Sequence, residues 1–176
     1  SPAFCGQDAQ YGWDAVHQVS ERYIRTEPTF GEPVVKDNVT GLDWQGCTAG
    51  LNGSACATGS IADKKWADSL AYCDALGWGG YTDWRLPSRY ELRTIVDHSR
   101  SEPAIDLGAF PNTDFWYFWS SSFYAGGFQV WRVSFISGSV TTTGPSDVLY
   151  VRCVRGGALG GQRTRTELVI GQPVVT

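Results

Sequence analysis

Two stretches of the chain place apolar residues at helical spacing. The first covers residues 62–76, and its apolar positions are Trp66, Leu70, Cys73 and Leu76. Gly77 stands where this helix would end. The second begins at Ser88, because Ser88 and Glu91 match a capping box and the apolar residues that follow on one face are Leu92, Ile95 and Val96. The pattern predicts one helix over residues 62–76 and another over residues 88–97.

Alternating apolar and polar residues predict strands in much of the remaining chain. A hairpin is expected from residues 34–37 and 42–44, because Asn38 and Gly41 in the connecting turn tolerate the backbone angles that it requires. Further strands are predicted at residues 118–120, 128–135, 140–142 and 147–154. In the two longer strands the alternation directs two sets of side chains to one face each, namely Trp131, Val133 and Phe135, and Leu149, Val151 and Cys153. These elements predict an α+β domain, with two helices packed on antiparallel strands and long irregular loops.

The five cysteines lack the C-x-x-C spacing of zinc and thioredoxin sites. Disulfides, and with them an oxidising compartment outside the cytoplasm, are the natural interpretation. Cys73 lies on the apolar face of the first helix and Cys153 faces inward from the last strand, so we expect a bridge between them. Cys47 and Cys56 then form a local pair that closes a loop rich in Gly, Ser and Ala. Cys5 is left as the odd thiol, available to an upstream or neighbouring chain.

The composition indicates one rigid extracellular domain and excludes a disordered chain. The 176 residues include eight Trp, eight Tyr and eight Phe, while only 18% are charged. The net charge of −4 offers no basic surface for nucleic acid, and no apolar run reaches the roughly 18 residues that insertion into a membrane requires. Methionine is absent, so we expect either a mature product without its leader or a piece of a longer exported protein.

The C-terminal tail repeats an earlier stretch of the chain. Residues 163–175 can be laid over residues 23–35, and seven positions are identical. We therefore divide the chain into an extended leader over residues 1–21, a domain over residues 22–156 and a tail over residues 157–176. The tail is interpreted either as the start of a further tandem repeat or as an assembly strand that takes the place of the first strand in a neighbouring copy. The residues expected to make such contacts are Arg165, Glu167, Val169, Gly171, Val174 and Val175.

A set of short motifs occurs in a familiar order along residues 6–155. They are residues 6–11, residues 35–45, Trp66 with residues 71–73, residues 79–88 with Glu91 and Leu92, residues 119–121 and residues 151–155. Together they resemble the family named after the C-terminal domain of the Legionella collagen-like protein. That resemblance implies a C-type-lectin-like fold, a disulfide between the first helix and the last strand, and an exported bacterial protein at the cell surface. The family's name-giver is an adhesin that binds sulfated glycans, but the acidic charge of this chain argues against the same specificity.

Aromatic residues are the main candidates for ligand or subunit contacts. Strand alternation turns some rings in and after residues 115–119 away from the core, and the candidates are Trp116, Tyr117 and Tyr124. Such rings could stack on sugars or pack against another subunit; alternatively, they form a second apolar layer that the leader covers. In the preceding loop, oxygen ligands for calcium could come from Glu102, Asp106 and Asp114, although acidic loop residues are commonly just solvated.

Two other patterns are interpreted as structural. Residues 83–87 concentrate charge beside an aromatic ring, but we expect Trp84 in the core and Arg85 paired with a carboxylate, either Asp83 or Glu91. The glycosylation sequons at residues 38–40 and 52–54 are interpreted as turn chemistry.

The sequence offers little for catalysis. His17 and His98 lie in unrelated segments, and neither a Gly-x-Ser-x-Gly motif nor a histidine pair at metal-ligand spacing occurs. We therefore expect no enzyme and no cofactor; a formylglycine-generating oxidase would need a reactive cysteine near the C-terminus, and Cys153 is better explained as a disulfide. Two hypotheses remain. One is an adhesive or structural subunit of an extracellular filament or other assembly, whose partners are other copies of itself; the other is a monomeric glycan- or calcium-binding domain from a tandem-repeat surface protein.

Overall fold

The computed structural model describes residues 22–157, so the leader with Cys5 and His17 and the repeated part of the tail lie outside the described residues. One antiparallel sheet has the strand order β1-β2-β3-β9 and consists of β1 (Tyr23–Thr29), β2 (Glu32–Asp37), β3 (Leu42–Gln45) and β9 (Val154–Gly156). A second consists of β6 (Tyr117–Tyr124), β7 (Gln129–Ser134) and β8 (Val140–Thr143), and a short ribbon joins β4 (Leu51–Asn52) to β5 (Thr58–Gly59). The helices are α3 (Trp66–Asp74) and α4 (Arg89–Thr94).

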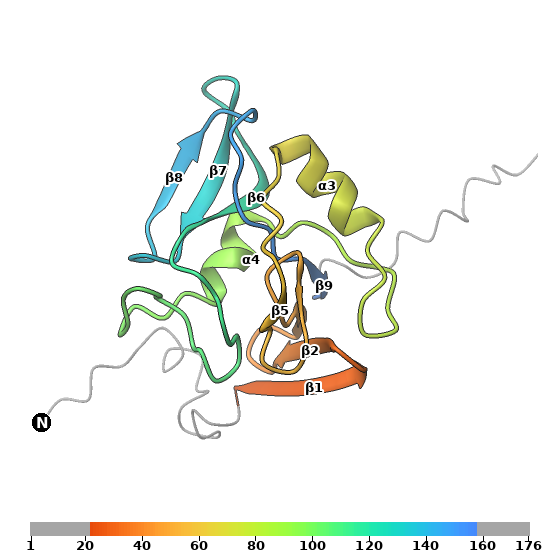
Figure 1. The fold of residues 1–176 in the computed structure, drawn as a ribbon. Helices are drawn as coiled ribbons and strands as arrows, with labels where there is room; N and C mark the ends of the chain where they lie inside the picture. Colours follow the sequence, from red (N-terminus) through yellow and green to blue (C-terminus); the bar gives the residue numbers. More distant parts are fainter. Residues whose placement is uncertain (1–21, 158–176) are drawn as a thin grey trace, which may run out of the picture.

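The two larger sheets lie at opposite ends of the described domain, with α4 between them (Figure 1). Helix α4 packs against β6 and β7, and α3 packs against β6. This arrangement confirms the predicted α+β class with two helices on antiparallel strands. The finer assignment to a C-type-lectin-like fold remains a prediction from the family resemblance.

The predicted hairpin at residues 34–44 is confirmed as β2 and β3, in which Val35 lies opposite Trp44 and Asp37 opposite Leu42. Its turn is held by the buried carboxylate of Asp37, which accepts hydrogen bonds from the Val39 N–H at 3.0 Å and the Thr40 hydroxyl at 2.9 Å. Strand β1 pairs with the other edge of β2 and was not predicted. Most of its side chains are exposed, so its sequence lacks the apolar alternation by which strands are recognised.

Both predicted helices are present but shorter than expected. Helix α3 begins at Trp66 because the backbone of Lys64 bonds to Leu149 in an isolated bridge, with N–H to oxygen distances of 2.9 and 3.0 Å. Residues 62–65 are therefore extended, which corrects the predicted start at residue 62. The capping box of α4 is confirmed, since Ser88 and Glu91 each accept a hydrogen bond from the other's backbone N–H. That helix ends at Thr94, three residues before the expected end.

The prediction of one continuous strand over residues 147–154 is wrong, because its backbone changes partner at almost every residue. Leu149 bonds to Lys64, Tyr150 to β6, and the carbonyl of Val151 accepts from Ala49. Next, the Cys153 carbonyl accepts from Gln45, and only from Val154 does the chain form β9. We call residues 149–154 the connector. It links the two larger sheets to each other, and it also bonds to the segment before α3 and to the loop after β3.

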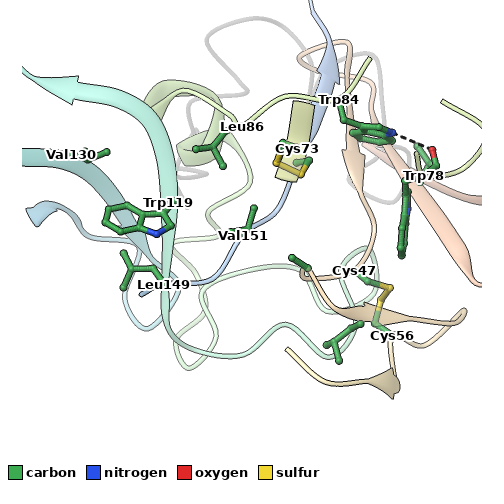
Figure 2. Close-up of a cluster of buried hydrophobic side chains, with 14 residues drawn as sticks. Cys47, Cys56, Cys73, Trp78, Trp84, Leu86, Trp119, Val130, Leu149 and Val151 are labelled. Carbon is green, nitrogen blue, oxygen red and sulfur yellow. Dashed lines mark hydrogen bonds between the residues drawn. A yellow bond between two sulfur atoms is a disulfide. The ribbon is translucent and has the colours of Figure 1, made fainter. Parts of the chain in front are cut away.

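Side chains of the connector alternate between two apolar cores. Leu149, Val151 and Cys153 lie in one core, as the predicted alternation requires, together with Trp119 of β6 and Val34 of β2. Figure 2 shows this core, in which the Trp84 ring lies near the Cys73 disulfide and its Nε1–H donates to the Trp78 carbonyl at 3.1 Å. The other core receives Val154 from the connector and contains Val35, Trp44, Phe118 and Val133.

Arg152 is the buried charge of the connector. Its side chain is fully buried, and its Nη atoms donate to the carbonyls of Gln45 at 2.8 Å and Gly46 at 3.0 Å and to the Thr113 hydroxyl at 2.8 Å. The ring of Phe110 lies 4.8 Å from the guanidinium carbon. Burial lowers the pKa of Arg152 to about 9, with a smaller contribution from the charge of Arg25, so the group still carries its proton at neutral pH.

Both disulfides expected from the sequence are present in the structure. Cys73 of α3 is bonded to Cys153 of the connector at a sequence separation of 80, and Cys47 is bonded to Cys56 at a sequence separation of nine. All four cysteines are buried in the same core. The first bond therefore fastens α3 to the connector, and the second closes only the loop that contains β4.

We expect loss of the Cys73–Cys153 bond to destabilise the protein more than loss of Cys47–Cys56. Chain entropy predicts decreases in the free energy of unfolding of about 4.5 kcal/mol for the 80-residue separation and about 2.6 kcal/mol for the nine-residue one. Guanidinium unfolding of the two double Cys→Ala variants, each carrying Cys5→Ser, measures both values. A larger loss from removal of the local bond would contradict this ranking.

Candidate functional site

Aromatic rings at the β6–β7 hairpin form the most exposed apolar surface that the sequence predicted. Trp116 is partly exposed and meets the half-buried Tyr117 edge-on, with ring centroids 5.7 Å apart. Tyr124 is also partly exposed, and its ring lies 5.5 Å from that of Trp131. Phe128, in the turn of the hairpin, is 90% exposed. The structure thus spreads the predicted aromatic residues along one hairpin and does not gather them into one pocket.

Sequence reasoning missed Arg89, which links this surface to the start of α4. Its guanidinium lies 4.3 Å from the Trp131 ring centroid and 4.6 Å from that of Tyr90, and it donates to the Tyr90 hydroxyl at 2.6 Å. Trp131 therefore contacts both Arg89 and Tyr124. In the sequence, Arg89 is recognisable only as the second position of a capping box, so no local signal could have placed it on an aromatic ring.

A shallow depression lies between α3, β6 and the segment that leads into α4. It is lined by Leu70, Ala71, Asp74, Arg85, Leu86 and Ser121. Its polar groups are a carboxylate, a hydroxyl and a guanidinium, and the guanidinium of Arg85 is already paired with Glu91. The depression is open and shallow, which is typical of a contact surface and unlike an enclosed substrate pocket.

The three acidic residues proposed for calcium do not form a cluster. Asp106 accepts a hydrogen bond from the Gly108 N–H at 2.8 Å, and Asp114 accepts one from the Tyr150 hydroxyl at 3.2 Å. Glu102 precedes a cis peptide bond in the same loop. Over residues 22–157, no three His, Cys, Asp or Glu side chains lie close enough together to hold a metal ion. Asp106 and Asp114 instead stabilise the loop.

Residues 83–87 are structural, as expected, but the two carboxylates have separate partners. Arg85 pairs with Glu91 through an Nη1 to Oε2 distance of 2.8 Å, whereas Asp83 accepts from Arg155 at 2.6 Å. Hydrogen bonding to Arg155 holds the pKa of Asp83 below its usual range. Burial alone would raise the pKa of Glu91, but hydrogen bonds from Arg85 and the Ser88 backbone outweigh burial and lower it. These pairs fix the loop against α4 and β9.

Of the residues considered for catalysis, the structure describes Cys153 and His98. Cys153 is committed to its disulfide with Cys73, so it is not available for formylglycine-type chemistry. The first sequon is turn chemistry in part, since the Thr40 hydroxyl donates to Asp37. His98 lies near Gly138, which is in the connection between β7 and β8.

The β1–β2 hairpin occupies a defined set of contacts, which we call the hairpin seat: Gly46, Ser54, Trp78, Gly79 and Ala109. Arg25 donates to the carbonyls of Ser54 at 2.6 Å and Ala109 at 3.0 Å, and burial lowers its pKa against the opposing effect of Glu27. The Trp78 Nε1–H donates to the Pro33 carbonyl at 2.7 Å. Strand β1 is an end strand of its sheet within the described residues. The hairpin therefore fills the seat within its own domain.

Comparison with known proteins decides the family. The model of the Lcl C-terminal domain matches residues 33–155, which is more than half of the chain and includes β2, both helices and the connector. The chain belongs to the Lcl C-terminal domain family. Lcl C-terminal domains are modules of bacterial surface proteins, and the family is not known for enzymatic activity. No curated protein matches the chain.

The Lcl match agrees with the motifs that led to the family from the sequence. It spans both disulfides and every part of the aromatic surface, but it begins after β1 and ends before the tail. Within residues 22–157 no helix is long and apolar enough to cross a bilayer.

Glu91 provides a test of the ion pair with Arg85, which anchors the loop of residues 83–87 to α4. Because its pKa is lowered in the folded state, Glu91 stabilises the protein above pH 4.5, and that stabilisation is lost as the pH falls below 4.5. We expect Glu91→Gln, which keeps the cap, to lower the free energy of unfolding at pH 7 by about 1 kcal/mol and Glu91→Ala by about 1 kcal/mol more. Urea unfolding from pH 7 to pH 3 measures this. A Glu91→Gln deficit that persists unchanged at pH 3 would contradict the assignment.

Proposed function

We propose that this chain is a non-enzymatic module of the bacterial cell surface that acts as an adhesive and structural subunit of an extracellular assembly. In this proposal the tail of one copy contacts the next copy. The two disulfides and membership of a family of surface modules support an extracellular role. The exposed rings of the β6–β7 hairpin would supply adhesive contacts.

The observation that carries the proposal is the repeat of the β1–β2 hairpin in the tail. Val34 and Val35 of β2 are buried, one in each apolar core. The tail repeats them as Val174 and Val175. Residues 23–35 already fill these positions within their own domain, so a second set of the same residues is used either on another copy or in a following tandem repeat. We propose the first of these uses, an intermolecular contact, because it accounts for an assembly.

Removal of the tail tests this function. We expect the full chain to form filaments or closed oligomers and a chain that ends at Gly161 to stay monomeric, because the truncation removes the repeated residues. Electron microscopy and light scattering at matched concentration, without reductant, measure the difference.

A matched pair of tail variants separates specific contacts from loss of length. Val174→Asp with Val175→Asp should abolish assembly, whereas Ile170→Asn should not, because Ile170 corresponds to Phe30, which is 98% exposed. Well-folded monomers at every concentration of the full chain would overturn the proposal.

The second candidate is a monomeric glycan-binding module, and the contact of Arg89 with Tyr90 and Trp131 favours it. A partly exposed aromatic ring beside a guanidinium presents both a stacking face and hydrogen-bond donors to a sugar ring. We then expect Trp131→Ala to lower affinity for a bound glycan at least tenfold on a glycan array, with Phe128→Ala as the control. Calcium dependence of that binding would further support this candidate; unchanged binding by Trp131→Ala would exclude this surface.

A further inference from the structure

We infer that residues 163–175 are a second copy of the β1–β2 hairpin and that they occupy the hairpin seat of another copy of this chain. This inference rests on the proposed function and specifies its geometry: the tail replaces a hairpin and does not merely pair along an edge. The partner is then a second copy of the same domain, in which the tail takes the place of residues 23–35.

The tail repeats the polar residues by which the hairpin binds its seat. Arg25 reaches three carbonyls of the seat, and its equivalent is Arg165. Glu27 accepts a hydrogen bond from the Gly31 N–H at 2.5 Å, and this pair recurs as Glu167 and Gly171. Gly31 has a φ of +82°, which a residue with a side chain rarely adopts. The tail thus has the residues for both the turn and the arginine anchor.

The apolar half of the hairpin is kept as well. The Pro33 carbonyl accepts from the Trp78 Nε1–H and from the Gly46 N–H, and Pro173 repeats the proline. A Cβ added at Gly46 would lie 2.5 Å from the Pro33 oxygen, and one added at Gly79 would lie 2.5 Å from a methyl carbon of Val34. The seat is therefore shaped to a Pro-Val pair, which the tail supplies at residues 173–174.

Positions that differ between the two stretches are mostly those that the seat does not contact. Ile24 and Phe30 are 48% and 98% exposed, and Thr164 and Ile170 replace them. Pro28 and Thr29 are also exposed and become Leu168 and Val169. Glu32, whose carboxylate accepts from the Gly79 N–H at 2.8 Å, becomes Gln172, which retains an acceptor oxygen. Tyr23, whose ring centroid lies 5.4 Å from that of Phe110, becomes Arg163, so one core-contacting position is not kept. Four of the six differing positions are thus exposed in the hairpin.

Because the seat is already filled within each domain, the tail must compete with residues 23–35 for it. The internal hairpin has the advantage of covalent linkage, which acts as a high effective concentration. Weakening the internal hairpin should therefore favour the tail, and weakening the tail should favour the internal hairpin. If the tail only paired along the edge of β1, weakening the internal hairpin and weakening the tail would not be expected to have opposite effects.

A disulfide trap reports occupation of the seat. Lys36 of β2 lies opposite Asp43 of β3, and Thr176 corresponds to Lys36. Opposed cross-strand residues have Cα atoms about 4.5–5.5 Å apart, which a disulfide spans. In a Cys5→Ser chain, Asp43→Cys with Thr176→Cys should give intermolecular disulfides, seen as dimers and larger species without reductant. Lys36→Cys with Asp43→Cys should close within one chain, and Thr141→Cys with Thr176→Cys, with Thr141 in the distant β8, should give no trapped species (Figure 1).

Matched substitutions in the trapping chain provide the decisive comparison. We expect Arg25→Ala to raise the trapped fraction about fivefold and Arg165→Ala to lower it about fivefold, the factor that corresponds to one ordinary hydrogen bond. Glu27→Gln and Glu167→Gln form a milder second pair if Arg25→Ala impairs folding. Assembly without trapping at residues 43 and 176, or equal effects from both members of each pair, would overturn seat exchange and leave the proposed function standing. Monomers in every sample would overturn both.

Discussion

The guanidinium of Arg152 joins parts of the chain that lie between 39 and 107 residues away from it. It holds the end of β3, the start of the disulfide-closed loop and the loop that precedes β6. No carboxylate pairs with it within the described residues, and its Nε has no hydrogen-bond partner. Carbonyl and hydroxyl oxygens and the Phe110 ring therefore offset the free energy required to bury the charge. Because these oxygens and this ring surround Arg152, the connector can pass between the two apolar cores with a charged residue in its middle.

The hairpin seat depends on the same region. The carbonyl of Gly46 accepts a hydrogen bond from Arg152 in the interior and, at 3.4 Å, another from Arg25 of β1. The closed loop also supplies the Ser54 carbonyl to Arg25. The interior charge thus positions the surface on which β1 and β2 lie, and through it the surface that we propose for the tail. A rigid seat of this kind would suit the recognition between copies that we propose.

Features encoded within a few residues could be predicted. The capping box at Ser88 and the turn around Asn38 and Gly41 depend only on local hydrogen bonds and backbone angles, and both are present. The periodicity of apolar residues showed that Cys73 and Cys153 both face the interior, and this was enough to predict their disulfide. At the candidate site, the sequence named Trp116, Tyr117 and Tyr124 as candidate contact residues, but it could not show that Trp131 lies between Tyr124 and Arg89, because that contact joins β7 to the start of α4.

By itself, the sequence determined the family, the α+β class, the local caps and turns and the facing of the cysteines, because each depends on near neighbours or on periodicity. Tertiary structure decided the rest. Residues 149–154 alternate like one strand, yet they take backbone partners from several separate segments, since hydrogen bonds between distant parts of the chain leave no local pattern. The same reason explains why Asp83 pairs with Arg155 and not with its neighbour Arg85, and why the largely polar β1 became visible only in its place beside β2.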